Sequence, residues 1–555
     1  MSTTTSPERP QLDHPPSAED DVQTLASVNA APASAPKSRA FYLSFVAIMV
    51  ATFLSALDLT AIGTALPTIA NALNDTKGDY TWVGSAYALS STAFIPLSGN
   101  LADTFGRRPI MLISIAFFAV GSALAGASQN MDMMIAARAI QGIGGGGIIN
   151  LSEILTADLV PLAERGLYQG MLGLVWSFAS SIGPPIGGAL ANEGSKAWRW
   201  LFYLNLPLTG IAFFLVWTFL SVRTPEGSIR SKLALVDWTG NAILIVGAGL
   251  AIIGMTWGGI RYPWQSAQVL APLIIGFALM IVFAIYEAKV PERPTIPRDI
   301  VSNRTSLSGL LTTAAHGIVS ISMIYYLPVF FQACFGASPI RSAVDFLPGA
   351  LVVAPFALTT GIVVTITKQY RIVNWVGWVI SIVGFGLYTL LRQDASVAQW
   401  VGFQVVVSIG MGILYAGPVF PLLAPLPNNR TASALALFSF TRSFFQTWGI
   451  TISGTILQNM LLKKLPADFV AQFPAGFEIA FAAIPAIKLL EEPLRTQVQA
   501  AFAESMATIW QTMIGISGLG LLCSFLMAEV PLGTTVDENY ALQEKDEKLG
   551  DAEKR

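Results

Sequence analysis

The stretch RAIQGIGGGGIINLSEILTAD, residues 138–158, decides how the rest of this sequence is interpreted. An apolar lead-in, residues 133–137, places Arg138 inside a segment suited to membrane hydrocarbon. A buried arginine in lipid is costly unless it faces a partner or a water-filled cavity. The glycines at 144–147 lower helix propensity but let neighbouring backbones approach closely. The stretch therefore predicts a membrane helix that borders a polar central cavity.

The composition predicts an all-α integral membrane protein. Of the 555 residues, 53% are hydrophobic and only 12% are charged, whereas soluble domains carry about 25% charged residues. A net charge of −2 lacks the excess of positive charge expected of a nucleic-acid-binding protein. The cysteines (Cys334, Cys523) and histidines (His14, His316) are too few and too scattered for a disulfide framework, a metal site or a catalytic triad.

Apolar runs of about 20 residues recur along the chain and predict about fourteen transmembrane helices. We expect their centres near residues 54, 89, 118, 145, 178, 212, 246, 277, 319, 354, 383, 410, 445 and 518. An even number of helices puts both termini on one side of the membrane. Lysine and arginine favour the loops on that side by about two to one, which predicts cytoplasmic termini.

Three segments fall outside these runs. Residues 1–40 and 531–555 are polar and are predicted to be disordered tails. The connection at 460–505 is the one long outer loop, and residues 486–506 within it are compatible with an amphipathic surface helix.

Asp58 is the costliest acid in the predicted spans, in the outer half of the first helix. Intramembrane acids are functional by default, so we expect Asp58 to load and release a proton. The alternatives are a structural partner for Arg138 or an interfacial residue. For Arg138, the alternative to a cavity-facing role is snorkelling to the outer surface.

Two further segments carry candidate residues. The loop GNLADTFGRRP, residues 99–109, combines close-packing and turn glycines with an acid and two arginines. These residues are Gly99, Asp103, Gly106, Arg107 and Arg108, and the alternative is an ordinary positive inner loop.

The second segment is SIGPPIGGAL, residues 181–190, where Pro184 and Pro185 remove backbone donors and predict that the fifth helix breaks or bends. Gly183, Gly187 and Gly188 provide a smooth packing surface, and the segment contains no group able to do chemistry.

Polar and aromatic residues within the other spans are candidates for a substrate cavity. A lone intramembrane histidine such as His316 is equally compatible with packing and with a ligand contact. Arg442 lies mid-span and is expected to face the cavity. The full candidate set is Gln141, Trp176, His316, Tyr325, Tyr326, Tyr415 and Arg442.

The sequence also contains glycosylation sequons. The one at Asn74 lies on the outer side of the predicted topology, close to the bilayer. Those at Asn303 and Asn429 would face the cytoplasm.

Taken together, these motifs resemble the major facilitator superfamily, and within it the fourteen-helix drug:proton antiporters of fungi that include mycotoxin efflux pumps. The likeness covers residues 42–527. The segments that carry it are LDLTAIGTALPTIA, GNLADTFGRRP, RAIQGIGGGG, GPPIGGAL, WRWLFYLNLPL, LVDWTG and YYLPVFFQACFGASPIRSAVDFLP.

The resemblance implies two six-helix bundles, at 41–222 and 301–530, joined by an inserted helix pair within 223–300. It implies alternating access driven by a proton gradient, without a cofactor. By motif, Asp58 and Arg138 would couple to protons, and Asp103, Arg107 and Arg108 would form a cytoplasmic gate. Gly183, Pro184, Gly187 and Gly188 would form the antiporter bend.

This sequence departs from the family pattern at two places. Ala179 stands where the antiporter segment usually has glycine, and it is small enough to preserve packing. Phe444 and Phe445 replace paired glycines after Arg442, which predicts a different packing or pocket in the thirteenth helix.

The resulting hypothesis is a monomeric exporter in the plasma membrane that exchanges protons for a hydrophobic small molecule. A vacuolar or vesicle membrane is the alternative location. An importer, for example of an iron chelate, and a transporter-like nutrient receptor are the alternative functions. An enzyme is the least favoured class, because no nucleophile–base pair, metal set or nucleotide loop is present.

Overall fold

The computed structural model describes residues 37–74, 82–193, 196–259, 261–291, 293–473, 479–535, 537 and 540. Apart from one isolated bridge between Gly258 and Tyr262, all regular structure in these residues is helical. Ten helices within the described part are long and apolar enough to cross a membrane. The predicted all-α membrane class is therefore confirmed. Of the predicted tail at 1–40, residues 1–36 lie outside the described residues, and the prediction is wrong for Arg39 and Ala40, which begin the first helix.

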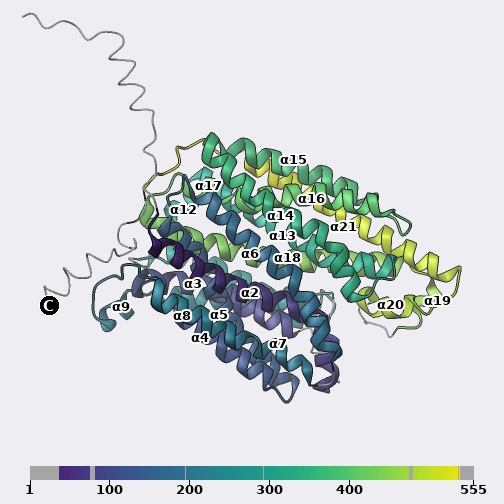
Figure 1. Cartoon of the computed structure of the whole chain (residues 1–555). Coiled ribbons are helices and arrows are strands. Elements are labelled where there is room, and N and C mark those ends of the chain that lie inside the picture. Colours follow the sequence, from purple (N-terminus) through teal and green to yellow (C-terminus); the bar gives the residue numbers. More distant parts are fainter. Residues whose placement is uncertain are drawn as a thin grey trace, which may run out of the picture.

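The helices form two bundles and an inserted pair (Figure 1). The N-terminal bundle comprises α2 (Arg39–Ala72), α3 (Trp82–Phe105), α4 (Arg107–Gly126), α5 (Met131–Leu159), α6 (Arg165–Asn192), η2 (Ala197–Arg199), α7 (Trp200–Tyr203) and α8 (Asn205–Phe219). The inserted part comprises α9 (Ile229–Leu235), α10 (Trp238–Trp257) and α11 (Ala267–Lys289). The C-terminal bundle comprises α12 (Arg298–Ser302), α13 (Arg304–Cys334), α14 (Pro339–Thr367), α15 (Tyr370–Tyr388), α16 (Val397–Ala416), α17 (Val419–Leu423), η3 (Asn428–Arg430), α18 (Thr431–Lys464), α19 (Ala467–Val470), α20 (Ile479–Ile487) and α21 (Leu494–Ser524).

Four further helices are long enough to span a membrane but are more polar than the ten counted above. They are α3, α5, α6 and α18, with 24, 29, 28 and 34 residues. Each of the four carries a glycine packed closely against another helix. The predicted number of about fourteen spans is consistent with this set.

Helix α5 organises the N-terminal bundle through its glycines. A β-carbon at Gly142 or Gly146 would lie 2.4 Å from a backbone oxygen of α3, and one at Gly144 would lie 2.4 Å from the Phe118 nitrogen of α4. Neither distance is possible between real atoms, so the absence of side chains lets α3 and α4 pack directly on α5. The opening stretch was therefore correctly interpreted as a close-packing helix.

The two bundles meet most tightly at the end that holds the α3–α4 turn at Gly106, called here the Gly106 end. There Gly166 of α6 and Gly361 of α14 approach so closely that either β-carbon would clash with the other backbone. An apolar core shared by both bundles closes this end, whereas the apolar cores at the opposite end, near Asn130, belong to one bundle each. The molecule is therefore closed at the Gly106 end.

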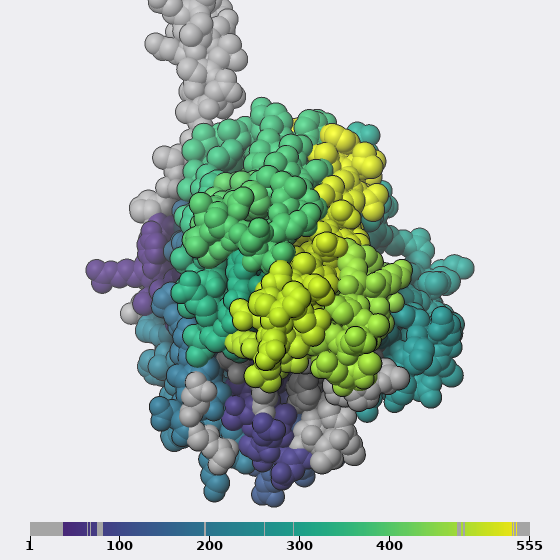
Figure 2. Space-filling view, turned by 90° about the vertical axis from the view of Figure 1, so that its right-hand side faces the viewer, coloured from purple at the N-terminus to yellow at the C-terminus, as the bar shows by residue number. Residues whose placement is uncertain are grey.

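The inserted helices α10 and α11 pack against each other and lie beside α3 and α18. Figure 2, which views the molecule from the end that carries α19 and α20, shows this teal pair to one side of the two bundles. The insertion therefore contacts one helix from each bundle without separating them.

Two predicted boundaries differ from the structure. α18 continues to Lys464 and α21 begins at Leu494, so the loop is shorter than 460–505. The predicted surface helix at 486–506 is instead split, because its second part is the buried start of α21, where Val498, Phe502 and Met506 join the bundle core. Their apolar side chains were matched to lipid, but the bundle covers them.

Candidate functional site

Asp58 and Arg138 form a buried ion pair between α2 and α5. Arg138 Nη1 lies 2.6 Å from Asp58 Oδ2, and both side chains are almost fully shielded from solvent. Arg138 Nε also donates to the Val83 carbonyl at 3.0 Å. Arg138 therefore faces a partner inside the bundle and does not snorkel to the surface.

The second oxygen of Asp58 is held by two amide side chains. Gln141 Nε2 and Asn205 Nδ2 donate to Asp58 Oδ1 at 2.9 and 2.7 Å. Both amides also donate to the Ser122 hydroxyl, and Arg138 donates to Gln141 Oε1. Side chains from α2, α4, α5 and α8 thus converge on one carboxylate.

Tyr87 covers the pair from α3. The Arg138 guanidinium lies 4.4 Å from the centre of the Tyr87 ring, and the Tyr87 hydroxyl lies 3.1 Å from Ser55 Oγ. A buried charge is tolerated only when it is paired and hydrogen-bonded. A proton on Asp58 would leave the Arg138 guanidinium without its charged partner.

A second ionic cluster lies at the other end of α5, about 30 Å away along the helix. Arg107 donates from Nε to Asp158 Oδ2 at 2.8 Å and from Nη1 to Asp103 Oδ1 at 2.6 Å. Gly106 provides the preceding turn with φ 97°, a left-handed conformation that favours glycine. Two of the residues predicted for a gate, Asp103 and Arg107, are thus in contact, and Asp158 is a further member of this cluster. Arg108 instead lies beside the Trp217 ring and donates to the Trp217 carbonyl.

The segment after α21 reaches this cluster. Tyr540 places its ring 3.6 Å from the Arg107 guanidinium and donates its hydroxyl to the Asp103 carbonyl at 2.8 Å. Burial raises the pKa of Tyr540 to about 12, so its hydroxyl is a neutral donor at physiological pH. Leu532 is buried in the shared core and Ala163 N donates to the Gly533 carbonyl at 3.1 Å. The prediction of a disordered tail from residue 531 is therefore wrong for these residues; residues 541–555 lie outside the described part.

The candidate antiporter segment lies within an uninterrupted α6, so the predicted break is absent although Pro184 and Pro185 are inside the helix. A β-carbon at Gly183 would lie 2.3 Å from Thr60 Oγ1 of α2. Gly188 faces Ile340 of α14, where a β-carbon would lie only 3.0 Å from the isoleucine side chain and would force it to shift. Gly187 is buried. The segment packs α6 against α2 and against the opposite bundle.

Arg442, Tyr415 and His316 come together from three helices of the C-terminal bundle. Arg442 Nη2 donates to the Tyr415 carbonyl at 2.8 Å, and its guanidinium lies 4.6 Å from the Tyr415 ring centre. The His316 ring lies 6.5 Å from the same ring, and His316 Nδ1 has no partner among the described residues. A β-carbon at Gly173 of α6 would lie 3.7 Å from the Tyr415 ring, so this group faces the N-terminal bundle.

The remaining cavity candidates lie elsewhere. Gln141 belongs to the Asp58 cluster, and Trp176 packs beside Ala179 between α2 and α6. Tyr326 is buried within the C-terminal bundle and donates to the Ile450 carbonyl at 3.0 Å, while Tyr325 is 50% exposed. Asn74 is exposed with φ 52°, just beyond α2, and the rest of its sequon lies outside the described residues.

Residue patterns missed several members of these clusters: Tyr87, Ser122, Glu153, Asp158, Gln169, Asn205 and Tyr540. Glu153 of α5 is buried and accepts from Gln169 of α6. Glu153 and Asp158 lie in the opening stretch, where an acid on an otherwise apolar helix is itself a signal. Asn205 and Ser122 gave no such signal, because neutral polar residues are common in membrane helices.

Known proteins resemble this chain in sequence and in fold. A family model described as Major Facilitator Superfamily matches residues 48–450. "Efflux pump FUS6" of Gibberella moniliformis (strain M3125 / FGSC 7600) is 37% identical over 522 residues, covering 93% of this chain and 92% of that protein. "MFS-type efflux pump LUC4" of a Fusarium species is 36% identical and covers 96% of this chain and 95% of its own length. The "Acurin A biosynthesis cluster MFS-type transporter" of Aspergillus aculeatus (strain ATCC 16872 / CBS 172.66 / WB 5094) is 36% identical, covering 91% and 92%.

Solved structures support the fold. The human organic anion transporter MFSD10 (TETRAN) superposes with a TM-score of 0.54 at 14% identity, covering 88% of this chain and 100% of that one. The proton:xylose symporter XylE superposes with a TM-score of 0.51 at 14% identity, covering 85% of this chain and 96% of that one. At this identity the likeness concerns the arrangement of helices alone.

Proposed function

Because this chain belongs to the major facilitator superfamily, we propose that it exports a hydrophobic small molecule, such as a secondary metabolite or toxin, in exchange for protons. Relatives that carry the name efflux pump match along more than nine-tenths of this chain, which favours export over import. The protein is a multi-pass membrane protein. The plasma membrane, cytoplasmic termini and a monomeric state complete the proposal.

The observation that carries proton coupling is the Asp58–Arg138 pair. Its members come from two helices, it is shielded from solvent, and it has no second acid to replace Asp58 among the described contacts of Arg138. In the proposed cycle Asp58 takes a proton from the outer side and releases Arg138. The helices then reorient, and the proton leaves to the cytoplasm as new substrate binds.

The Gly106 end is taken as the cytoplasmic side, so the described conformation is closed to the cytoplasm. The shared apolar core and the contact of Tyr540 with Arg107 hold that end shut. Opening requires both to separate, and reorientation driven at Asp58 must therefore be transmitted along α5. Substrate is proposed to contact Arg442, Tyr415 and His316, which lie between the two ionic clusters, where the bundles face each other.

The outer surface would then include Asn74, a proposed glycan acceptor. Residues 303 and 429 would face the cytoplasm and stay unmodified. A mass shift on glycosidase treatment that persists in an Asn74→Gln variant would contradict this orientation.

The decisive test is Asp58→Asn in a pump-deficient yeast strain, with accumulation of a panel of toxins measured in cells and in vesicles with an imposed pH gradient. We expect abolished gradient-driven export with normal abundance at the membrane. The matched control is Asp132→Asn, an exposed acid at the start of α5, which should export normally. Normal export by Asp58→Asn, or increased accumulation on expression of the unmodified protein, would refute the proposal.

A further inference from the structure

Two buried carboxylates face each other where the inserted helices α10 and α11 meet. Asp237, at the N-terminus of α10, is 9% exposed, and Glu287, near the end of α11, is 7% exposed. A β-carbon at Gly240 would lie 2.0 Å from Asp237 Oδ2 and 3.0 Å from Glu287 Oε1. The two carboxylates thus border the same small space beside Gly240.

Neither carboxylate is paired with a basic residue in the described part of the chain. Among the described residues no lysine or arginine forms an ion pair with Asp237 or Glu287. Their donors are neutral: Gly240 N and the Tyr286 hydroxyl for Asp237 Oδ1, at 2.9 and 3.1 Å, and the nitrogens of residues 295 and 296 for Glu287. Two like charges this close in a buried site cannot both ionise without compensation.

The site also has too few hydrogen-bond donors for its acceptors. Within the described part of the chain, Asp237 Oδ2 is buried without a donor, and so is Asn241 Oδ1, whose side chain is 2% exposed and lies in the same cluster. Buried acceptors without donors are uncommon, and an ordered water, an ion or a proton shared between two acceptors can satisfy them. A single proton between Glu287 and Asp237 Oδ2 would supply a hydrogen bond where two acceptors now oppose each other.

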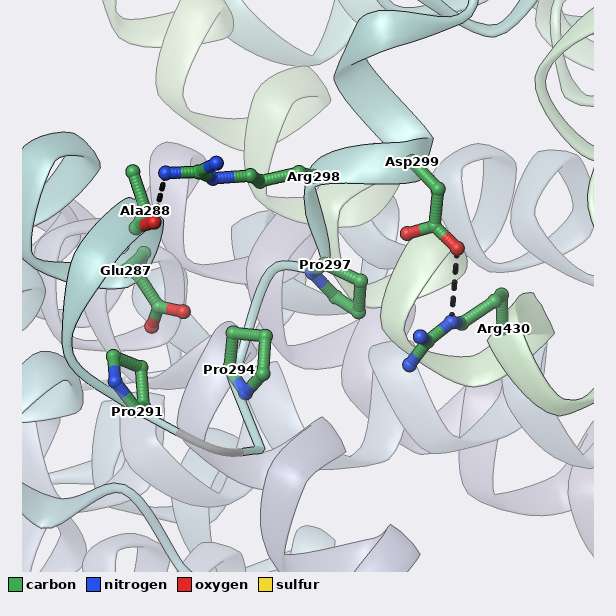
Figure 3. Close-up of a pocket in the computed structure, with 8 residues that line it drawn as sticks. All are labelled: Glu287, Ala288, Pro291, Pro294, Pro297, Arg298, Asp299 and Arg430. Atoms are coloured by element: carbon green, nitrogen blue, oxygen red, sulfur yellow. Dashed lines mark hydrogen bonds and ion pairs between the residues drawn. The ribbon is translucent and has the colours of Figure 1, made fainter.

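Water reaches this pair from one side. Glu287 lines a cavity with Pro291, Pro294 and Pro297, and Figure 3 shows its side chain directed between these rings. Proline has no backbone N–H, so the donors that this segment offers to Glu287 are the nitrogens of residues 295 and 296. The charged groups at the far rim are engaged elsewhere: Arg298 with the Ala288 carbonyl, and Arg430 with Asp299 at 3.0 Å (Figure 3).

The pair is connected to the gate segment (residues 99–109). Thr295 donates its backbone N–H to Glu287 Oε1 at 3.3 Å, and its hydroxyl accepts from Asn241 of α10 at 3.0 Å and from Asn100 of α3 at 3.2 Å. Asn100 follows Gly99, which packs on Ala436 of the opposite bundle. A change at the carboxylate pair therefore reaches the bundle interface through one shared hydroxyl.

We propose that Asp237 and Glu287 form a second proton-binding site, located in the inserted helix pair, that exchanges its proton through the proline-lined cavity at the Gly106 end. The site is independent of the Asp58–Arg138 pair, which lies within the N-terminal bundle. Its titration links the insertion to the position of α3.

The test is infrared difference spectroscopy of the purified full-length protein across a pH titration, with deuterium exchange to identify the C=O stretch of a protonated carboxyl. We expect a protonated-carboxyl band at neutral pH in the unmodified protein and in Asp58→Asn. Glu287→Gln and Asp237→Asn should each lose it. An asparagine at position 237 keeps an oxygen that can accept from Gly240 N–H and is expected to preserve the start of α10. Asp237→Asn therefore still tests the proposal if Glu287→Gln fails to fold.

The matched control is Asp299→Asn. Asp299 lines the same cavity but is ion-paired with Arg430. The band of this variant should match that of the unmodified protein. A band that persists in both Glu287→Gln and Asp237→Asn overturns the proposal. So does a band that disappears when sodium or potassium replaces N-methylglucamine at constant ionic strength, since a metal cation would then occupy the pair. Because Asp58→Asn is expected to keep the band, failure here is distinguishable from failure of the proposed transport function.

Discussion

The ring of Tyr540 stacks on the guanidinium of Arg107, with 3.6 Å between the ring centre and Arg107 Cζ. The same guanidinium bonds to Asp103 and Asp158, so one arginine joins the α3–α4 turn, the end of α5 and the C-terminal segment. Residues near the chain's end therefore reinforce an interaction within the N-terminal bundle. The closed state of the Gly106 end depends in part on a segment that lies outside every membrane helix.

Replacing Tyr540 by alanine should weaken this closure. Loss of a cation–π contact worth about 0.5–2 kcal/mol predicts a roughly 2- to 30-fold increase in the open population. The measurement is maleimide labelling of an Ala432→Cys reporter, which is buried in the shared core, in a chain whose Cys334 and Cys523 are replaced by alanine. Tyr540→Phe, which keeps the ring, should label more slowly than Tyr540→Ala, and equal rates for the alanine variant and the parent would rule out the stacking role.

The α6–α14 contact should be sensitive to a single methyl group. A β-carbon at Gly361 would lie 2.1 Å from the Gly166 backbone, so Gly361→Ala must separate the bundles at the Gly106 end. We expect faster labelling of the same Ala432→Cys reporter and reduced export. Gly386→Ala is the control, because nothing lies within 4 Å of its β-carbon position. If both variants label at the parental rate, this contact does not hold the end closed.

Arg138 should not be replaceable by lysine. Its guanidinium serves Asp58, Gln141 and the Val83 carbonyl at once, and a lysine ammonium cannot reproduce this planar arrangement. Because disrupting a buried pair costs about 3–5 kcal/mol, Arg138→Lys should lower gradient-driven export by about tenfold or more. Arg341→Lys, an exposed arginine paired with Asp345, should export normally in the same vesicles. Full export by the Arg138 variant would show that charge alone suffices.

The packing of α5 can be tested by thermal denaturation of the detergent-purified protein. A β-carbon at Gly146 would lie 2.4 Å from the Ser91 carbonyl oxygen, so Gly146→Ala should destabilise the fold by about 1–3 kcal/mol. Gly249→Ala in α10 has open space at the β-carbon position and should be neutral or slightly stabilising. A Gly146→Ala protein as stable as its parent would mean that α3 can shift away at little cost.

Much of the architecture followed from local sequence properties. Apolar length determined where helices form, and every predicted centre, from residue 54 to residue 518, falls within a helix. The glycines at 144–147 determined that α5 packs closely, because the lack of a side chain is a local property. The same holds for Gly106, whose φ of 97° suits the turn before Arg107.

What each charge contacts was decided by tertiary structure. Asp58 and Arg138 are each recognisable as costly in lipid, but Asn205 and Ser122 acquire a role only because α8 and α4 place them beside the carboxylate. Tyr540 lies in a polar tail whose composition predicts disorder, and it is ordered because Arg107 offers a flat cation and Asp103 a carbonyl. Solvation cost is carried by a single residue and can be read along the chain, whereas compensation for it requires partners that only the folded arrangement of helices brings within reach.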